Sequence, residues 1–255
     1  MKHIDLNCDM GEMPEALADG TQETLMRYIS SANIACGGHA GDARIMRETI
    51  QQAARHNVAV GAHPGYEDRA NFGRLELHLG PEEISASVLR QILALQNMAD
   101  RCGARIIHVK PHGALYNQSA RDCQIARAIA EGVRRWRNDV TMVGLAGSVM
   151  LEEFCSVGFP IAAEAFADRR YEKDGSLRSR KFPDALLRDP QQAADQALRI
   201  VEQGTVIASD GTVVPLLALT ICIHGDTPGA TQIAATVHHR LTAAGIRIEA
   251  LNASR

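Results

Sequence analysis

The chain has 255 residues, 45% hydrophobic and 22% charged, which is typical of a globular protein and excludes a wholly disordered one. Its net charge of −3 and aromatic content of 4% exclude a basic surface for nucleic acid or an anionic membrane, and offer few rings for base stacking. We expect residues 1–255 to form a single α/β-barrel domain, because such barrels take about 250 residues.

The N-terminus and the cysteines indicate a cytoplasmic protein. Charged residues within the first twelve positions stand where a secretory signal needs an apolar segment. The longest apolar run, Val213–Ile223, contains Pro215 and is too short to cross a bilayer. The six cysteines include no CxxC pair. We therefore expect free thiols, a cytoplasmic location and no membrane association.

Strand-like runs alternate with helical patterns along the chain. Seven strands are predicted: His3–Cys8, Ser31–Cys36, Asn57–His63, Arg105–Lys110, Val140–Leu145, Phe159–Phe166 and Leu219–His224. The predicted helices are Gln22–Ile29, Asp42–His56, Pro81–Cys102, Asp122–Trp136, Ser148–Ser156, Pro190–Gln203 and Thr227–Ala244. Thr205–Leu216 is typical of a β-hairpin, and Ile246–Leu251 is predicted to form a last short strand. Seven strand–helix units favour parallel strands in a closed or slightly distorted barrel.

Polar side chains occur at matching positions along these strands. Histidines lie at or just past the ends of the second, third, fourth and seventh strands: His39, His63, His112 and His224. The first and sixth strands contribute Asp5, Asn7, Asp9 and Glu164. The carboxyl ends of barrel strands meet on one face, where barrel enzymes have their active sites. The sequence therefore predicts a functional site on this rim, although one such histidine alone is more often structural.

The residue types at the rim suggest three kinds of chemistry. Imidazoles and carboxylates bind divalent metals or transfer protons near neutral pH. Lys110 offers a positive charge for an oxyanion or a phosphate. Glycines at 37–38 and at Gly61 allow the backbone to approach a ligand closely, or form tight barrel corners.

Anion binding is expected at two predicted helix starts, one at Asp42 and one at Asp226–Thr227. The polar stretch Asp168–Asp184, which contains several arginines, is predicted to be either a lid over an anionic substrate or a surface loop or subunit contact. No GxxxxGK[ST] motif occurs, so ATP would need a different binding site or a partner protein.

The sequence lacks the local motifs that are typical of a metal site. The sequence contains no HExxH or HxH motif and no zinc-deaminase spacing. Asp9, His39, His63 and His112 could bind a metal only if the fold brings them together. We therefore expect no tightly bound metal.

Six long motifs are distributed along the chain: DLNCDMGE (5–12), NIACGGHAGD (33–42), GAHPGYEDRANFGR (61–74), VKPHGALYN (109–117), EAFADRRY (164–171) and CIHGDTPGA (222–230). Over nearly the whole chain they resemble the LamB/YcsF family. The resemblance implies a distorted (β/α)7 TIM-like barrel of the glycoside hydrolase/deacetylase type. It also implies the activity of the A component of an ATP-dependent 5-oxoprolinase, which converts 5-oxo-L-proline to L-glutamate. ATP, with Mg²⁺, would be the co-substrate, and 5-oxoprolinase subunits B and C the partners.

On this hypothesis two groups of residues form the site. The residues expected to be catalytic are Asp9, His39, His63, Lys110 and His112, with Asp9 or His112 activating the water. Substrate or phosphate binding is expected of Asn7, Gly38, Asp42, Glu164, Arg170, His224, Asp226 and Thr227. The alternatives are a metal-dependent, deacetylase-like amide hydrolase, a hydrolase of another lactam, and a non-catalytic member of the complex. A homo-oligomer is also compatible with the sequence.

Overall fold

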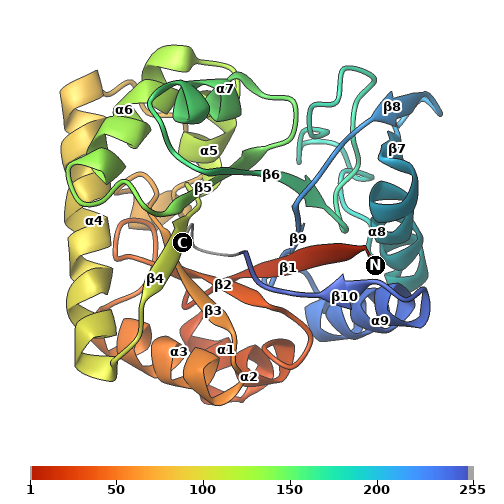
Figure 1. The fold of residues 1–255 in the computed structure, drawn as a ribbon, viewed down its shortest axis with the longest axis horizontal. Coiled ribbons are helices and arrows are strands. Elements are labelled where there is room, and N and C mark those ends of the chain that lie inside the picture. The colour runs from red at the N-terminus through yellow and green to blue at the C-terminus, as the bar shows by residue number, and fades with distance from the viewer. Residues whose placement is uncertain (1, 252–255) are drawn as a thin grey trace.

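The computed structural model describes residues 2–251, and its centre is a closed barrel of seven parallel strands (Figure 1). In order around the ring these are β1 His3–Met10, β2 Ser31–Ala35, β3 Ala59–His63, β4 Ile106–Val109, β5 Thr141–Leu145, β6 Ile161–Phe166 and β9 Thr220–Ile223. The ring closes because β9 pairs in parallel with β1. A short strand, β10 (Arg247–Ile248), pairs with the start of β1. The predicted seven-stranded barrel is confirmed.

Helices surround the ring, as Figure 1 shows. They are α1 Pro14–Ala18, α2 Thr21–Leu25, α3 Ala43–Arg55, α4 Pro81–Cys102, α5 Gly113–Ser119, α6 Cys123–Arg134, α7 Val149–Ser156, α8 Pro190–Gln203 and α9 Ala230–Ala243. The short helices α1 and α5 were not predicted. The predicted hairpin is confirmed as β7 (Thr205–Ile207) and β8 (Val213–Pro215), which pair antiparallel. Among residues 2–251, no helix has the length and apolar character needed to span a membrane.

The strand β1 explains why the barrel interior is polar. Side chains alternate between the two faces of a strand. Ile4, Leu6, Cys8 and Met10 are buried in the hydrophobic core, and the residues between them, Asp5, Asn7 and Asp9, point into the barrel. Barrel interiors are usually filled by branched apolar side chains. Here hydrogen bonds across the strands compensate for burying polar groups instead.

One predicted helix start is wrong. The helix α9 begins at Ala230, three residues after the predicted start at Thr227, because Gly229 precedes it in the left-handed conformation (φ 81°). The hydroxyl of Thr227 lies 3.5 Å from the carboxylate of Asp168. The N–H groups of the first turn of α9 therefore belong to residues after Gly229 and not to Asp226 and Thr227.

The other predicted helix start is confirmed. Asp42 is the N-cap of α3, and its carboxylate accepts a hydrogen bond of 2.8 Å from the backbone N–H of Ile45. That carboxylate already supplies a negative charge to the helix terminus. A second anion would have to compete with it.

Candidate active site

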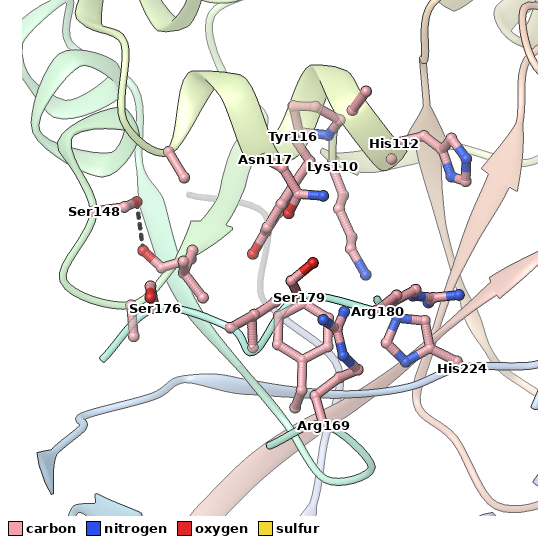
Figure 2. A pocket seen from close by; sticks show the side chains of 18 of the residues that line it. Lys110, His112, Tyr116, Asn117, Ser148, Arg169, Ser176, Ser179, Arg180 and His224 are labelled. Carbon is pink, nitrogen blue, oxygen red and sulfur yellow. Dashed lines mark hydrogen bonds between the residues drawn. The ribbon is translucent and has the colours of Figure 1, made fainter. Parts of the chain in front are cut away.

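A cavity of about 1150 Å³ lies at the carboxyl ends of the barrel strands. Residues at the ends of six strands contribute to its wall: Asp9, His63, Lys110, Leu145, Phe166 and His224. The 168–184 loop adds further side chains, among them Arg169 and Arg180. Figure 2 shows Lys110, His112, His224 and the two arginines around this cavity. The predicted convergence of polar residues on the rim is therefore observed.

Lys110 is the centre of a buried ion network below the cavity. Its Nζ lies 2.8 Å from Glu164 Oε1, 3.0 Å from Asp9 Oδ1 and 3.2 Å from Asn7 Oδ1. Glu164 Oε2 accepts a further hydrogen bond of 2.7 Å from the hydroxyl of Tyr116. An ammonium group has three N–H donors. All three are directed to partners, which leaves none free for an oxyanion in this arrangement.

The charges in this network are fixed by their neighbours. Burial alone would lower the pKa of Lys110, but Asp9, Cys222 and Glu164 raise it well above its ordinary value. Burial alone would raise the pKa of Asp9, but the charges of His63 and Lys110 bring it well below its ordinary value. Lys110 is therefore a permanent cation, and Asp9 a carboxylate, at neutral pH.

A second buried layer joins β2, β3 and β4. His108 Nε2 lies 2.7 Å from Asn33 Oδ1, and the amide of Asn33 donates to both Asn7 and Asp9. Burial lowers the pKa of His108 to about 3, so its ring is neutral. Gly61 provides the space for this ring, since a Cβ at that position would lie 2.0 Å from His108 Nε2. Gly61 thus accommodates a side chain of the barrel interior.

We expect Gly61→Ala to lower the free energy of unfolding by about 1–3 kcal/mol, because the added methyl group overpacks a filled interior. Urea unfolding measures the effect. The loss should be smaller when His108 is also replaced by alanine, since the clash is then relieved. An unchanged unfolding free energy for Gly61→Ala alone would show that His108 can move aside.

Three histidines and one glutamate meet at one edge of the cavity. His39 Nε2 and His112 Nδ1 lie 2.8 Å and 3.0 Å from Oε1 of Glu12. His63 Nε2 lies 3.0 Å from His112 Nδ1 and 3.3 Å from Asp9 Oδ2. Burial opposes the charged form of Glu12, but its contacts with His112 and His39 lower its pKa overall. Together these four side chains offer donor atoms that could hold a metal ion.

On another wall of the cavity, His224 and Asp168 form a dyad. Nδ1 of His224 lies 2.8 Å from Asp168 Oδ1, and the backbone N–H of His224 donates to Oδ2. Burial alone would raise the pKa of Asp168, but the charge and hydrogen bonds of His224 lower it overall. Phe166 stacks on the imidazole, with ring centroids 5.4 Å apart. A carboxylate that fixes Nδ1–H leaves Nε2 to exchange protons with a ligand.

Two guanidinium groups of the 168–184 loop give this part of the cavity a positive charge. Burial and the nearby charge of Arg180 lower the pKa of Arg169 to about 10, so it remains protonated at neutral pH. Asp226 forms ion pairs with Arg74 and, at 3.8 Å, with Arg180. Such a wall suits a small carboxylate or a phosphoryl group.

The structure brings together part of the predicted set. Six predicted residues line the cavity: Asp9, His63, Lys110, His112, His224 and Asp226. His39 stacks on His112, with centroids 3.6 Å apart, and Asn7 and Glu164 contact Lys110. Outside the lining residues lie Gly38, Asp42, Arg170 and Thr227. At Gly38 a Cβ would lie 2.3 Å from Gln91 Oε1, so this glycine accommodates a side chain of α4.

Asp168 and Arg169 belong to the stretch that was predicted as a lid or a surface loop. Two residues of the site were not predicted: Glu12 and Tyr116. Glu12 lies just past β1 in the first of the six motifs, and Gly11 (φ 71°) turns the chain there. Tyr116 lies on α5, which was not predicted. Their position inside the long motifs was the available signal, since neither belongs to a regular pattern.

Comparison with known proteins places the chain in a family. The LamB/YcsF family model matches residues 4–255. The chain is 52% identical to the A component of 5-oxoprolinase from Chloroflexus aggregans, covering 97% of this chain and 98% of that protein. It is 48% identical to the protein of the same name in Methylococcus capsulatus, covering 97% and 95%.

Comparison with solved structures supports the same family assignment. A lactam utilization protein from Thermus thermophilus superposes with a TM-score of 0.92 at 43% identity, covering 98% of this chain and all of that one. A family 4 carbohydrate esterase from Streptomyces lividans shares the fold, with a TM-score of 0.53 at 11% identity, covering 98% and 93%. The family model and these full-length similarities show that the chain belongs to the LamB/YcsF family.

Proposed function

We propose that this chain is the A component of an ATP-dependent 5-oxoprolinase, which opens 5-oxo-L-proline to L-glutamate. The proposal rests on the full-length similarity to relatives that carry this name. The cavity supports it, because proton-transfer groups lie beside guanidinium groups suited to the substrate carboxylate. In this proposal residues 1–255 act as one domain in a complex with the B and C components, and ATP with Mg²⁺ is the co-substrate.

The proposed chemistry overcomes the resonance of the lactam. Transfer of a phosphoryl group from ATP to the lactam oxygen makes the ring carbon electrophilic. Water then adds to that carbon, and the C–N bond breaks as the ring nitrogen takes up a proton. A second water hydrolyses the resulting γ-glutamyl phosphate to glutamate and phosphate. Ring opening needs one group to accept a proton from water and another to donate one to nitrogen.

The geometry suggests which residues take these roles. His224 is the proposed proton donor to the ring nitrogen, because Asp168 fixes Nδ1 and leaves Nε2 available. Asp9 is the proposed acceptor for the proton of the attacking water. His112 is the second candidate for that role, and its ring nitrogens contact His63 and the backbone oxygen of Phe72. Lys110 is proposed to position Asp9 and Glu164.

A second candidate function is metal-dependent hydrolysis of an unactivated amide without ATP. The cluster of Glu12 with three histidines favours it. The two functions differ in their need for ATP, so hydrolysis of simple amides by the isolated chain would support the second.

The first test is reconstitution with one component left out at a time. We expect the B and C components with 5-oxoproline and ATP to form glutamate only when this chain is present, with phosphate released in step. Glutamate and phosphate are measured in the same samples. Equal glutamate formation without this chain would contradict the proposal.

A further inference from the structure

We propose that Glu12, His39, His63 and His112 bind one divalent transition-metal ion. The residues come from the exits of β1 and β2, the end of β3 and the residue before α5. One ligand atom from each lies within 4.8 Å of every other, and all four residues pack in the rim of the barrel. The proposal departs from the expectation of no tightly bound metal, which was based on the absence of local histidine motifs.

The hydrogen bonds of two histidines fix which nitrogen carries the proton. Nδ1 of His63 lies 2.7 Å from the backbone oxygen of Lys110, and Nε2 of His112 lies 2.9 Å from that of Phe72. A carbonyl oxygen only accepts hydrogen bonds, so each of these nitrogens must be the N–H. When the ring is deprotonated, as metal binding requires, the other nitrogen of each presents a lone pair. A backbone carbonyl on the second nitrogen is the usual partner of a metal-binding histidine.

The lone pairs fixed in this way point at one another. Nε2 of His63 and Nδ1 of His112 are 3.0 Å apart, and Oε1 of Glu12 lies 3.0 Å from the latter. When both rings are neutral, the electron pairs of the two imidazoles and the carboxylate repel at this distance unless a proton or a metal cation lies between them. A metal ion would satisfy all three donors together, whereas a shared proton would satisfy only one contact.

The ligand His39 completes the set from the other side. Its Nε2 lies 2.8 Å from Glu12 Oε1, and its ring stacks on that of His112 within 4° of parallel. Its Nδ1 is buried and has no hydrogen-bond partner among residues 2–251.

The donor set selects the class of ion. Three imidazole nitrogens and one carboxylate oxygen suit zinc and its neighbours in the first transition row, whereas Mg²⁺ and Ca²⁺ prefer oxygen ligands. Bonds of about 2.0–2.1 Å in a tetrahedral site place ligands roughly 3.3 Å apart. Four of the six separations among these atoms are 2.8, 3.0, 3.0 and 3.7 Å, on either side of that value, and all six lie within 4.8 Å.

The ion would be reachable from the cavity. Glu12, His63 and His112 all line it. A divalent ion there would supply Lewis acidity to a bound oxygen. Metal binding by the isolated chain does not depend on the proposed reaction. The result of the binding test and the result of the glutamate assay can therefore be told apart.

The test is metal binding by the purified full-length chain after removal of metals with a chelator. We expect calorimetric titration with Zn²⁺ to show one tight site per chain, and Co²⁺ to give visible ligand-field bands typical of nitrogen and oxygen ligands. His63→Ala and Glu12→Gln should each weaken Zn²⁺ binding by about 100-fold or more. Circular dichroism checks that each variant is folded, and Zn²⁺ should raise the Tm of the wild type alone.

A matched control is the double variant His238→Gln, His239→Gln, which removes neighbouring histidines on α9 that are remote from the rim. It should leave the tight site unchanged. Two results would overturn the proposal. One is the absence of tight binding, with ¹⁵N NMR showing a proton on Nε2 of His63. The other is tight binding that persists in both rim variants and disappears in the α9 control.

Discussion

Replacing Lys110 by methionine is expected to lower the free energy of unfolding by about 3–5 kcal/mol. Removing one member of a buried ion pair leaves its partner charged and unpaired, and typical costs lie in this range. Here Asp9 and Glu164 both lose their cation, and Glu164 is fully buried. Urea unfolding of Lys110→Met beside the wild type measures the loss. Lys173→Met, an exposed lysine of the 168–184 loop, is the matched control and should change stability little.

The effect should also depend on pH. Lys110 is one of the charges that lower the pKa of Asp9, so its removal raises that pKa. The low pKa of Asp9 contributes stability that is present above the unfolded pKa and is lost as pH falls through the folded pKa. A smaller lowering reduces that contribution, so the destabilisation should be larger near neutral pH than at about pH 3. Adding Glu164→Gln should recover part of the loss, because one unpaired charge is removed. Equal stability of Lys110→Met and the wild type at both pH values would contradict a structural role for this network.

Replacing His224 by alanine is expected to lower kcat for glutamate formation by the reconstituted complex by about 10²–10⁴-fold, the usual contribution of a general acid or base. The fold should tolerate the change, because the side chain lies at the cavity wall and is 11% exposed. The measurement is glutamate released under saturating 5-oxoproline and ATP. His3→Ala is the matched control, since this exposed histidine starts β1 at the opposite end of the barrel.

Asp168→Asn tests how His224 is positioned. Loss of the carboxylate removes the charge that holds Nδ1–H, so kcat should fall and its pH profile should shift. A variant that is only partly unfolded would show a lower kcat at every pH, with an unchanged pH profile. If His224→Ala retains half of the wild-type kcat, the dyad is not the proton donor.

The barrel could be predicted because local and global preferences agree along most of the chain. Pro81 at the start of α4 and the capping residue Asp42 mark helix boundaries that the structure confirms. The start of α9 could not be placed in the same way. Pro228 resembles a first-turn residue, but Gly229 adopts the left-handed conformation (φ 81°), so the helix begins only at Ala230.

The rim could be predicted as a region but not as a set of contacts. Histidines at strand ends signal the face on which they meet, since parallel strands end on one side. Whether Lys110 faces a ligand or two carboxylates depends on Asp9 and Glu164, which are distant in the sequence. Glu12 does not belong to a helical or strand pattern in the sequence. Its place beside the histidines depends on the turn after β1, where Gly11 has φ 71°. The four proposed metal ligands come from four separate segments, so no local spacing could reveal them.

The most direct test of where the lactam is opened is a crystal structure of the assembled complex with 5-oxoproline and a non-hydrolysable ATP analogue. We expect the lactam in the cavity at the barrel rim of this chain, with its ring nitrogen within hydrogen-bond distance of His224 Nε2 and its carboxylate near Arg169 or Arg180. A lactam bound wholly within the B or C component, with this cavity filled only by solvent, would contradict the proposed catalytic role of this chain.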